Sequence, residues 1–417
     1  MVRMSVKVPI FLWSVLIFSM CIVSSVQTMN LVQPYYAFMK PRYEPDTAFQ
    51  FGAYVEKGFQ FKGYGDDCSG SDPLMIWQKR QNALAMLQGF DETSPQGLLL
   101  SMLQMDQQSC ALLSLTGSLH HDFSLGFSGR YYMCHDFSIG AYLPVYKVSF
   151  DTPSWCAQTS ISCERTQQFL LDNFRRNVKR LGEDLDITHW SRVGIGDLTI
   201  LFEWTRDFKQ HKEFLKNVRL NCRVGPSFPT GKRRDEDLLM ALPFGGDGCT
   251  GVVFGGSLEI LLGCYIRCGM DVELTHFFGN TRDRRVKIDR DQTELLLLKK
   301  VCAYSDPGLI QHFNLFLGAY DIFGGLYVNF DYEFYKHGES RLSIISNNYS
   351  NNIANCAESL ESWTAHHAIF KIGYDFTDVV GDKACAIPTL TAYIRTPIEG
   401  TRAILDTTVG LMVSCDF

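Results

Sequence analysis

Long apolar runs are almost absent from this sequence of 417 residues, of which 20% are charged. Only VPIFLWSVLIFSMCIV, at residues 8–23, is continuously hydrophobic. A bundle of membrane-spanning helices is therefore excluded, because each such helix needs about 20 consecutive apolar residues. There is no excess of positive charge either: the formal net charge of −6 gives no indication of nucleic-acid binding.

The sequence also lacks a complete catalytic motif. GPSFPTGKR, from Gly225, resembles a phosphate-binding loop, but five rather than four residues separate its glycines, and Arg233 stands where Ser or Thr is required. His120 and His121 are adjacent, so on a strand they point to opposite faces and do not form a metal site. We expect no catalytic residue, metal or cofactor. A membrane phospholipase with a Ser–His pair on a barrel wall is a minor alternative.

The apolar N-terminal stretch has the layout of a secretory signal peptide. Arg3 and Lys7 lie before and at the edge of the run, and the small residues Ser24 and Ser25 follow it. An uncleaved anchor helix is the alternative, but the run is slightly short for a membrane span. We expect residues 1–28 to be a signal peptide and residues 29–417 to be the exported protein.

What the sequence has in abundance is alternation of apolar and polar residues. In LYVNFDYEFY, residues 326–335, the apolar side chains share one parity, and Asn329, Asp331 and Glu333 share the other. This period of two is typical of a strand with one apolar face. About twelve such strands are predicted, at 47–63, 116–129, 135–150, 195–208, 217–229, 250–263, 267–280, 309–321, 323–336, 364–376, 385–398 and 402–417.

The connections between these strands alternate in length. Long ones are expected at 64–115, 151–194, 230–249, 281–308 and 337–363, and short ones lie between them, with a final turn at 397–400. Short turns on one side and long loops on the other are typical of bacterial outer-membrane barrels. We therefore predict an all-β fold: a closed, antiparallel, up-and-down transmembrane barrel in the outer membrane, with short helices in the long loops.

The polar parity of the strands carries many charged residues, which we expect to face the lumen. They either pair across strands and fill a plugged barrel, or line a water-filled path for passive transport of small molecules. Arg219 and Arg223 are the strongest candidates for setting an ion preference. The full set is Glu56, Lys62, Lys147, Glu203, Arg219, Arg223, Glu259, Asp271, Glu273, Asp331, Glu333, Lys371 and Arg395.

The last residues point to a partner. Leu411, Val413 and Phe417 alternate toward a terminal aromatic residue, which resembles the signal that barrel-assembly machinery reads on bacterial outer-membrane proteins. The other expected partners are the lipid bilayer and small-molecule solutes, with a homo-oligomer as an open question.

The long loops carry helices and cysteines. Residues 164–181 place apolar side chains on one helical face and are either a gate in the lumen or an external cap; residues 74–90 and 96–105 also have helical character. All but one of the 14 cysteines lie outside the signal peptide, so an exported chain should form disulfides. We expect Cys68–Cys110 and Cys156–Cys163, because each pair lies within one long loop.

Three motifs resemble a known family. FSLGFSGRYYMCHDFSIGAYLPVYKV, VGIGDLTILFEW and VRLNCRVGPSFPTGK are similar to strands of outer-membrane proteins associated with the phenol meta-degradation pathway, which resemble long-chain fatty acid transporters. The resemblance covers residues 116–265 and implies a barrel that transports small, possibly hydrophobic molecules. The many cysteines resemble instead the cysteine-rich major porins of intracellular bacteria, which implies the rival role of a disulfide-linked envelope scaffold.

The signal peptide gives the first testable prediction. Mass spectrometry of the protein extracted from membranes should find a new N-terminus between residues 23 and 30, because the small residues there follow the apolar run. An intact Met1 would show that the apolar run is an anchor.

Overall fold

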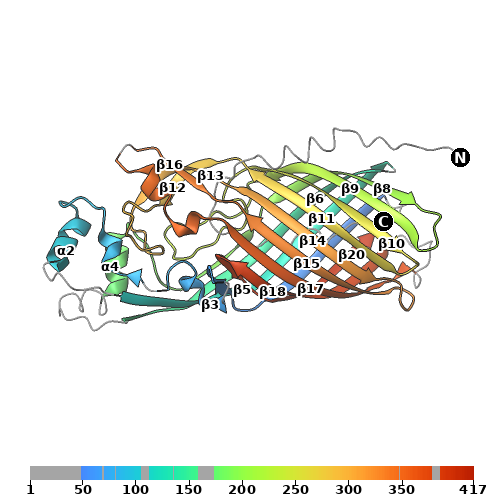
Figure 1. Cartoon of the computed structure of the whole chain (residues 1–417), viewed down its shortest axis with the longest axis horizontal. Coiled ribbons are helices and arrows are strands. Elements are labelled where there is room, and N and C mark those ends of the chain that lie inside the picture. The colour runs from blue at the N-terminus through green and yellow to red at the C-terminus, as the bar shows by residue number, and fades with distance from the viewer. Residues whose placement is uncertain are drawn as a thin grey trace.

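Twelve antiparallel strands close into a barrel (Figure 1), which confirms the fold class expected from the alternation. The computed structural model describes residues 48–67, 70–79, 81–104, 112–134, 136–157, 173–346, 348–377 and 386–417. The barrel strands are β1 (Phe49–Gly58), β5 (Leu112–Cys134), β6 (Phe137–Ala157), β8 (Leu198–Lys209), β9 (Leu215–Phe228), β10 (Gly251–Leu262), β11 (Ile266–Phe277), β14 (Leu309–Ala319), β15 (Leu326–His337), β17 (Trp363–Asp375), β18 (Ile387–Thr401) and β20 (Thr408–Asp416).

The barrel closes between its first and last strands. Strand β1 pairs with β5 on one side and with β20 on the other, and Val55 stands opposite Leu411. Closure leaves no unpaired strand edge, which a lipid environment would not tolerate.

The exterior of the wall is apolar over a limited height. On β6 the outward positions from Phe137 to Val145 are apolar, about the length of a tilted membrane-spanning strand. Lys147 follows on the same exterior face, where it forms an ion pair with Asp122 at 3.6 Å and is 41% exposed. Its expected lumen position is therefore wrong. Two of the three register shifts of β5 against β6 lie beyond this level, and the third lies at the turn end of the hairpin.

Several boundaries differ from those expected, because tertiary pairing extends or interrupts the strands. β5 and β6 run well beyond the expected spans and form a long hairpin. The expected strand at 195–208 is preceded by β7 (Trp190–Ile195), which pairs with β6 ahead of β8. The expected turn at 397–400 lies inside β18. A bulge there shifts the register between His366 and His367, and both histidines keep a cross-strand partner in β18.

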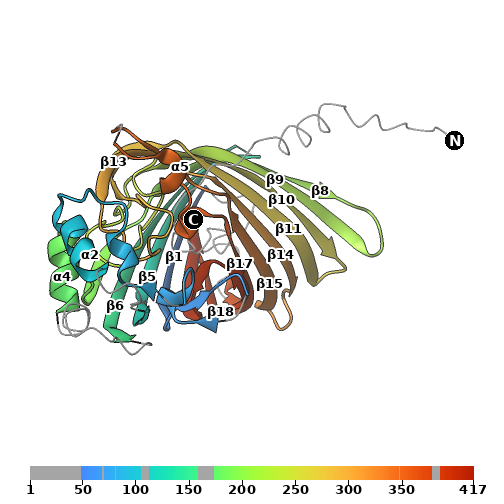
Figure 2. The same cartoon turned by 60° about the vertical axis from the view of Figure 1, so that its left-hand side comes forward.

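The long connections gather at one end of the barrel, opposite the short turns, and fold into a cap (Figures 1 and 2). The cap contains two small sheets that the alternation did not predict. One joins β12 (Asn280–Arg285), β13 (Lys300–Asp306) and β16 (Arg341–Ile344). The other joins β2 (Lys62–Tyr64), β3 (Gly70–Ser71) and β19 (Ala403–Leu405).

Helices in the cap agree only in part with the sequence. α2 (Pro95–Gln104) confirms a helix near 96–105, and α4 (Phe174–Leu181) covers the described part of 164–181. Residues 74–90 are not a helix: β4 (Gln81–Asn82) pairs with β5 and separates the short 3₁₀ turns η2 (Pro73–Met75) and η3 (Ala85–Leu87). The remaining turns are α5 (Asn351–Ala354) and η5 (Glu358–Leu360). Among the described residues, no helix has the length and apolarity to cross a membrane.

The cap has a hydrophobic core of its own. Phe174, Val178 and Leu181 of α4 are buried in a cluster that also contains Phe150 of β6 and Trp190 of β7. Because α4 lies beyond the barrel beside α2, it corresponds to the external-cap alternative and not to a gate inside the lumen (Figure 1).

The two ends of the barrel can be distinguished by native thiols. Cys302 and Cys356 are exposed in the cap, whereas Cys264 is exposed in the turn at 263–265 at the opposite end. If the long loops face outward, a membrane-impermeant maleimide added to intact cells should modify Cys302 and Cys356 and spare Cys264, as read by peptide mapping. Modification of Cys264 alone would reverse the topology.

Candidate functional site: the polar lumen and its cap

The charged residues singled out in the strands lie mostly on the buried face of the wall. Arg219 and Glu259 retain exposed side-chain fractions of 18% and 19%, while Lys62 is exposed in β2, outside the barrel wall, so its expected lumen position is wrong. The others are less than 10% exposed as residues: Glu56, Glu203, Arg223, Asp271, Glu273, Asp331, Glu333, Lys371 and Arg395.

Most cationic side chains of this face are held in ion pairs. Arg223 of β9 reaches over β10 to Asp271 and to Glu273 of β11, the latter at 3.0 Å. Arg219 binds the Asp207 carboxylate through Nε at 2.9 Å and Nη2 at 3.0 Å. Lys371 pairs with Asp331. Two-point contacts of this kind cancel charge locally and fix side-chain geometry.

The turn-side part of the lumen is filled by a similar network. Arg130 donates to Glu203 at 2.8 Å and to Gln50 at 2.7 Å, and Gln50 in turn donates to Asp416. A cavity beside Arg130 and Glu203 has a volume of about 20 Å³, room for about one water molecule. Arg130 was not singled out from the sequence, because Gly129 and Tyr131 interrupt a simple charge pattern there.

Nearer the cap, an inward row of polar residues crosses five neighbouring strands. His312 of β14 bonds Glu333 of β15 at 3.0 Å, and Glu333 stands directly opposite His367 of β17. Arg395 of β18 follows, and its cross-strand partner is Thr408 of β20. We call this row, from His312 to Thr408, the polar row.

Tyrosines bring opposite walls together at this level. The hydroxyls of Tyr54 in β1 and Tyr142 in β6 are 2.9 Å apart, with β5 between their strands. Tyr146 of β6 and Tyr335 of β15 are both buried on the inner face, although six strand positions separate them around the barrel. The lumen is therefore narrow at the polar row.

Two motifs noted in the sequence interlock just under the cap. Between β7 and β8, the buried Asp197 carboxylate accepts hydrogen bonds from the backbone N–H groups of Gly231 and Gly246. Thr230, in the Pro-Thr-Gly turn, donates to the Gly196 carbonyl at 2.9 Å and accepts from the Leu198 N–H. These bonds tie the connection after β9 to a break in the barrel wall.

Arg285 of β12 joins three of the long loops. Its guanidinium donates to the carbonyls of Gly182 at 2.7 Å and Leu298 at 3.1 Å, to the Glu236 carbonyl, and to the Asp237 carboxylate at 2.8 Å. The Gly182 carbonyl also accepts from the Leu185 N–H at 3.1 Å, whereas the Glu236 and Leu298 carbonyls, which are partly buried, depend on Arg285; leaving such a group without a donor costs about 1–3 kcal/mol. Arg285 therefore stabilises the closed cap.

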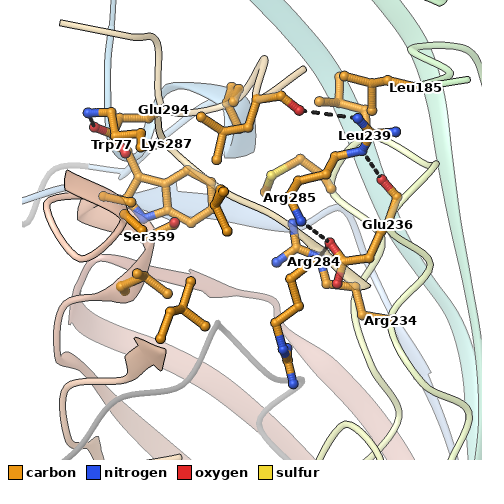
Figure 3. A pocket seen from close by; sticks show the side chains of 18 of the residues that line it. Trp77, Leu185, Arg234, Glu236, Leu239, Arg284, Arg285, Lys287, Glu294 and Ser359 are labelled. Carbon is orange, nitrogen blue, oxygen red and sulfur yellow. Dashed lines mark hydrogen bonds and ion pairs between the residues drawn. The ribbon is translucent and has the colours of Figure 1, made fainter. Parts of the chain in front are cut away.

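All five long loops meet at a cavity beside Arg285 (Figure 3). Trp77, Leu185, Leu239 and Leu297 supply apolar walls, and the Lys287–Glu294 ion pair lies at the Trp77 side. Its volume is about 50 Å³, well below the ~150 Å³ of a cavity that holds benzene. The cap must rearrange before an aromatic molecule could occupy it.

A cluster of carboxylates lies where the loops join. The Glu358 N–H donates to the Glu294 carboxylate at 2.9 Å, and Arg402 binds both Asp66 at 2.9 Å and Glu361 at 2.8 Å. Burial and, after it, the carboxylates of Glu294, Asp66 and Glu361 together raise the pKa of Glu358 to about 7, against the opposing effect of Lys287. This cluster joins residues from four separate connections.

The other expected site residues fall outside the lumen. Leu411, Val413 and Phe417 are exposed on the exterior, and the Phe417 ring lies 6.3 Å from that of Phe49; their role as an assembly signal stays a prediction. Cys156 is exposed in β6. Its expected partner Cys163, like Cys68 and Cys110, lies outside the described residues, so both disulfides also stay predictions.

Comparisons with known proteins give only distant structural likenesses. No family model and no curated protein matches the chain. An outer membrane channel from Pseudomonas putida F1 is 11% identical over 90% of this chain and 97% of its own, with a TM-score of 0.48. The monoaromatic hydrocarbon channel CymD (6% identical, 94% and 95% covered) and LpxR from Salmonella typhimurium (9%, 88% and 99%) have TM-scores of 0.29 and 0.27. The family resemblance therefore stays a prediction, and the function proposed below rests on the chain's own geometry.

The Glu358 cluster predicts a pH dependence of the cap. Because the pKa of Glu358 is raised from about 4.3 to about 7 in the folded cap, its contribution to stability is fully present below about pH 4.3 and is lost as the pH rises through 7. Once the intrinsic rise of amide exchange with pH is divided out, the protection of residues 338–346 and 348–362 should therefore fall between pH 5 and 8 in the wild type but much less in Glu358→Gln. The exposed Glu339→Gln variant is the control; identical profiles in all three proteins would contradict the assignment.

Proposed function

We propose that this protein is an outer-membrane channel for passive passage of small molecules, held closed by its cap. One observation carries the proposal: a closed barrel whose exterior is an apolar belt encloses an interior of charged and hydrogen-bonding side chains. A wall of this kind suits a membrane outside and water inside.

Unsatisfied polar atoms inside the barrel support a hydrated path. Tyr146 Oη, Arg395 Nε and Nη1, and Thr408 Oγ1 are buried without a hydrogen-bond partner among the described residues. Buried polar groups in proteins are nearly always paired with protein or with ordered water. Ordered water enclosed at these positions would satisfy them, as expected of a hydrated interior.

Small and possibly hydrophobic solutes remain the proposed cargo. The cap cavity supports this class because it combines indole and leucine walls with a few polar groups, the usual composition of a site for small molecules. The outer-membrane location follows in this proposal from the short turns and long loops at opposite ends.

A disulfide-linked envelope scaffold is the second candidate, and the exposed thiols of Cys302 and Cys356 in the cap favour it. Covalent ladders on non-reducing gels of isolated envelopes, which collapse to monomer on reduction, would support this role. A protein that stays monomeric without reductant would remove it.

Loosening the cap should open the channel. Arg285→Ala removes a guanidinium that donates hydrogen bonds to several loop carbonyls, which should destabilise the closed cap by about 2–3 kcal/mol. This corresponds to roughly a 30- to 150-fold change in the ratio of open to closed states. In planar bilayers the open probability of this variant should exceed that of the wild type, while the exposed Arg290→Ala control should not differ.

The opposite result is equally informative. Bilayers that stay silent with both the wild type and Arg285→Ala, although both proteins migrate as folded barrels on unheated gels, would rule out the channel. Unchanged solute uptake in cells lacking the protein would point the same way, and the scaffold role would then take its place.

A further inference from the structure

Arg395 differs from the other arginines singled out on the inner wall. It is 2% exposed, yet its Nε and Nη1 atoms have no hydrogen-bond acceptor among the described residues. Arg219 and Arg223, by contrast, each bind a carboxylate through two nitrogens. The charge of Arg395 is therefore not cancelled by a direct ion pair.

Three carboxylates surround Arg395 without forming a direct ion pair with it. The charges of Glu56, Glu333 and Asp406 act on it most strongly. Each has its own partner: Glu56 accepts from Tyr393 at 3.0 Å, and Glu333 and Asp406 each bond a histidine at 3.0 Å, His312 and His121 respectively. The buried Nε and Nη1 atoms of Arg395 thus lie among carboxylates that are bonded to other groups, without an acceptor of their own among the described residues.

The position of Arg395 strengthens the effect of its charge on an ion in the lumen. It lies in the polar row, where the buried rings of Tyr146 and Tyr335 occupy the inner face of opposite walls. In a narrow passage with protein walls the local dielectric is low, so one charge acts on a passing ion far more strongly than the same charge in solvent. Arg219 retains 18% exposure of its side chain and contacts two carboxylates, so solvent and partners screen it.

We propose that Arg395 sets the ionic preference of the lumen, an inference that rests on the channel function proposed above. Carboxylates outnumber arginines and lysines on the inner wall, so Arg395 limits a preference for cations that the rest of the lumen would impose. Among the described residues the carboxylates include Glu56, Glu203, Asp207, Glu259, Asp271, Glu273, Asp331, Glu333 and Asp416, with Asp406 in the connection before β20, and the cations include Arg130, Arg192, Arg219, Arg223, Arg267, Lys371 and Arg395.

The test compares two substitutions that remove the same charge. Arg395→Met and Arg219→Met, both made in the Arg285→Ala background so that the cap is open, are reconstituted in planar bilayers with a KCl gradient. We expect the cation-to-anion permeability ratio to rise about tenfold for Arg395→Met, because this guanidinium forms no direct ion pair with a described residue and lies in a passage of low dielectric. Arg219→Met should change it less than about twofold, and Arg395→Lys should keep the parent value.

Equal shifts for the two methionine variants would overturn the proposal, because the lumen would then respond only to its total charge. An unchanged ratio in Arg395→Met would do the same. If Arg395→Met fails to fold, Glu333→Gln at the same level decides the matter: it should lower the cation preference, and no change would refute the role of this level. Conduction with unaltered selectivity sinks this inference alone, whereas silence of the parent channel sinks the channel function itself.

Discussion

Closure of the sheet is the constraint on which the other features depend. Once β1 pairs with β20, every strand has an inside and an outside, and the period of two assigns each residue to one of them. A shift of one residue at the closing pair would turn Glu56 toward the exterior belt and Val55 toward the lumen. The cost of an ionised carboxylate in lipid therefore specifies the register of this pair tightly.

The cap follows from the same constraint. A barrel with a polar interior needs a separate apolar core if it is to be closed at one end, and the loops build one around Phe174, Phe150 and Trp190. Loops of this length contain many backbone carbonyls and amides that need hydrogen-bond partners. Arg285 donates to carbonyls, and the Asp197 carboxylate accepts from amides. Such bonds make the closed cap specific as well as stable.

The sequence predicted the barrel well because strand alternation is a local signal. All twelve expected strands have counterparts in the structure. The inward face of β11 and of β15 could be predicted directly from the alternate positions of Asp271, Glu273, Asp331 and Glu333. The cap could not be read this way. β12, β13 and β16 are short strands whose pairing is decided by tertiary contacts, and residues 74–90 have helical periodicity but follow the edge of β5 instead. Partners such as Arg285 with Gly182, far apart in sequence, leave no periodic trace.

The same contrast between local and long-range contacts explains why the sequence favoured Arg219 and Arg223 as the residues that set an ion preference. Their strand neighbours are acidic, so sequence alone suggests a strong local field. In the folded barrel that proximity pairs them with Asp207 and Asp271, and pairing removes the field from the lumen. Arg395 has no acidic neighbour within its own strand except Glu399, and its carboxylates come from β1, β15 and the connection before β20. They surround it without a direct ion pair, so the residue with the weakest local signal retains the most influence on a passing ion.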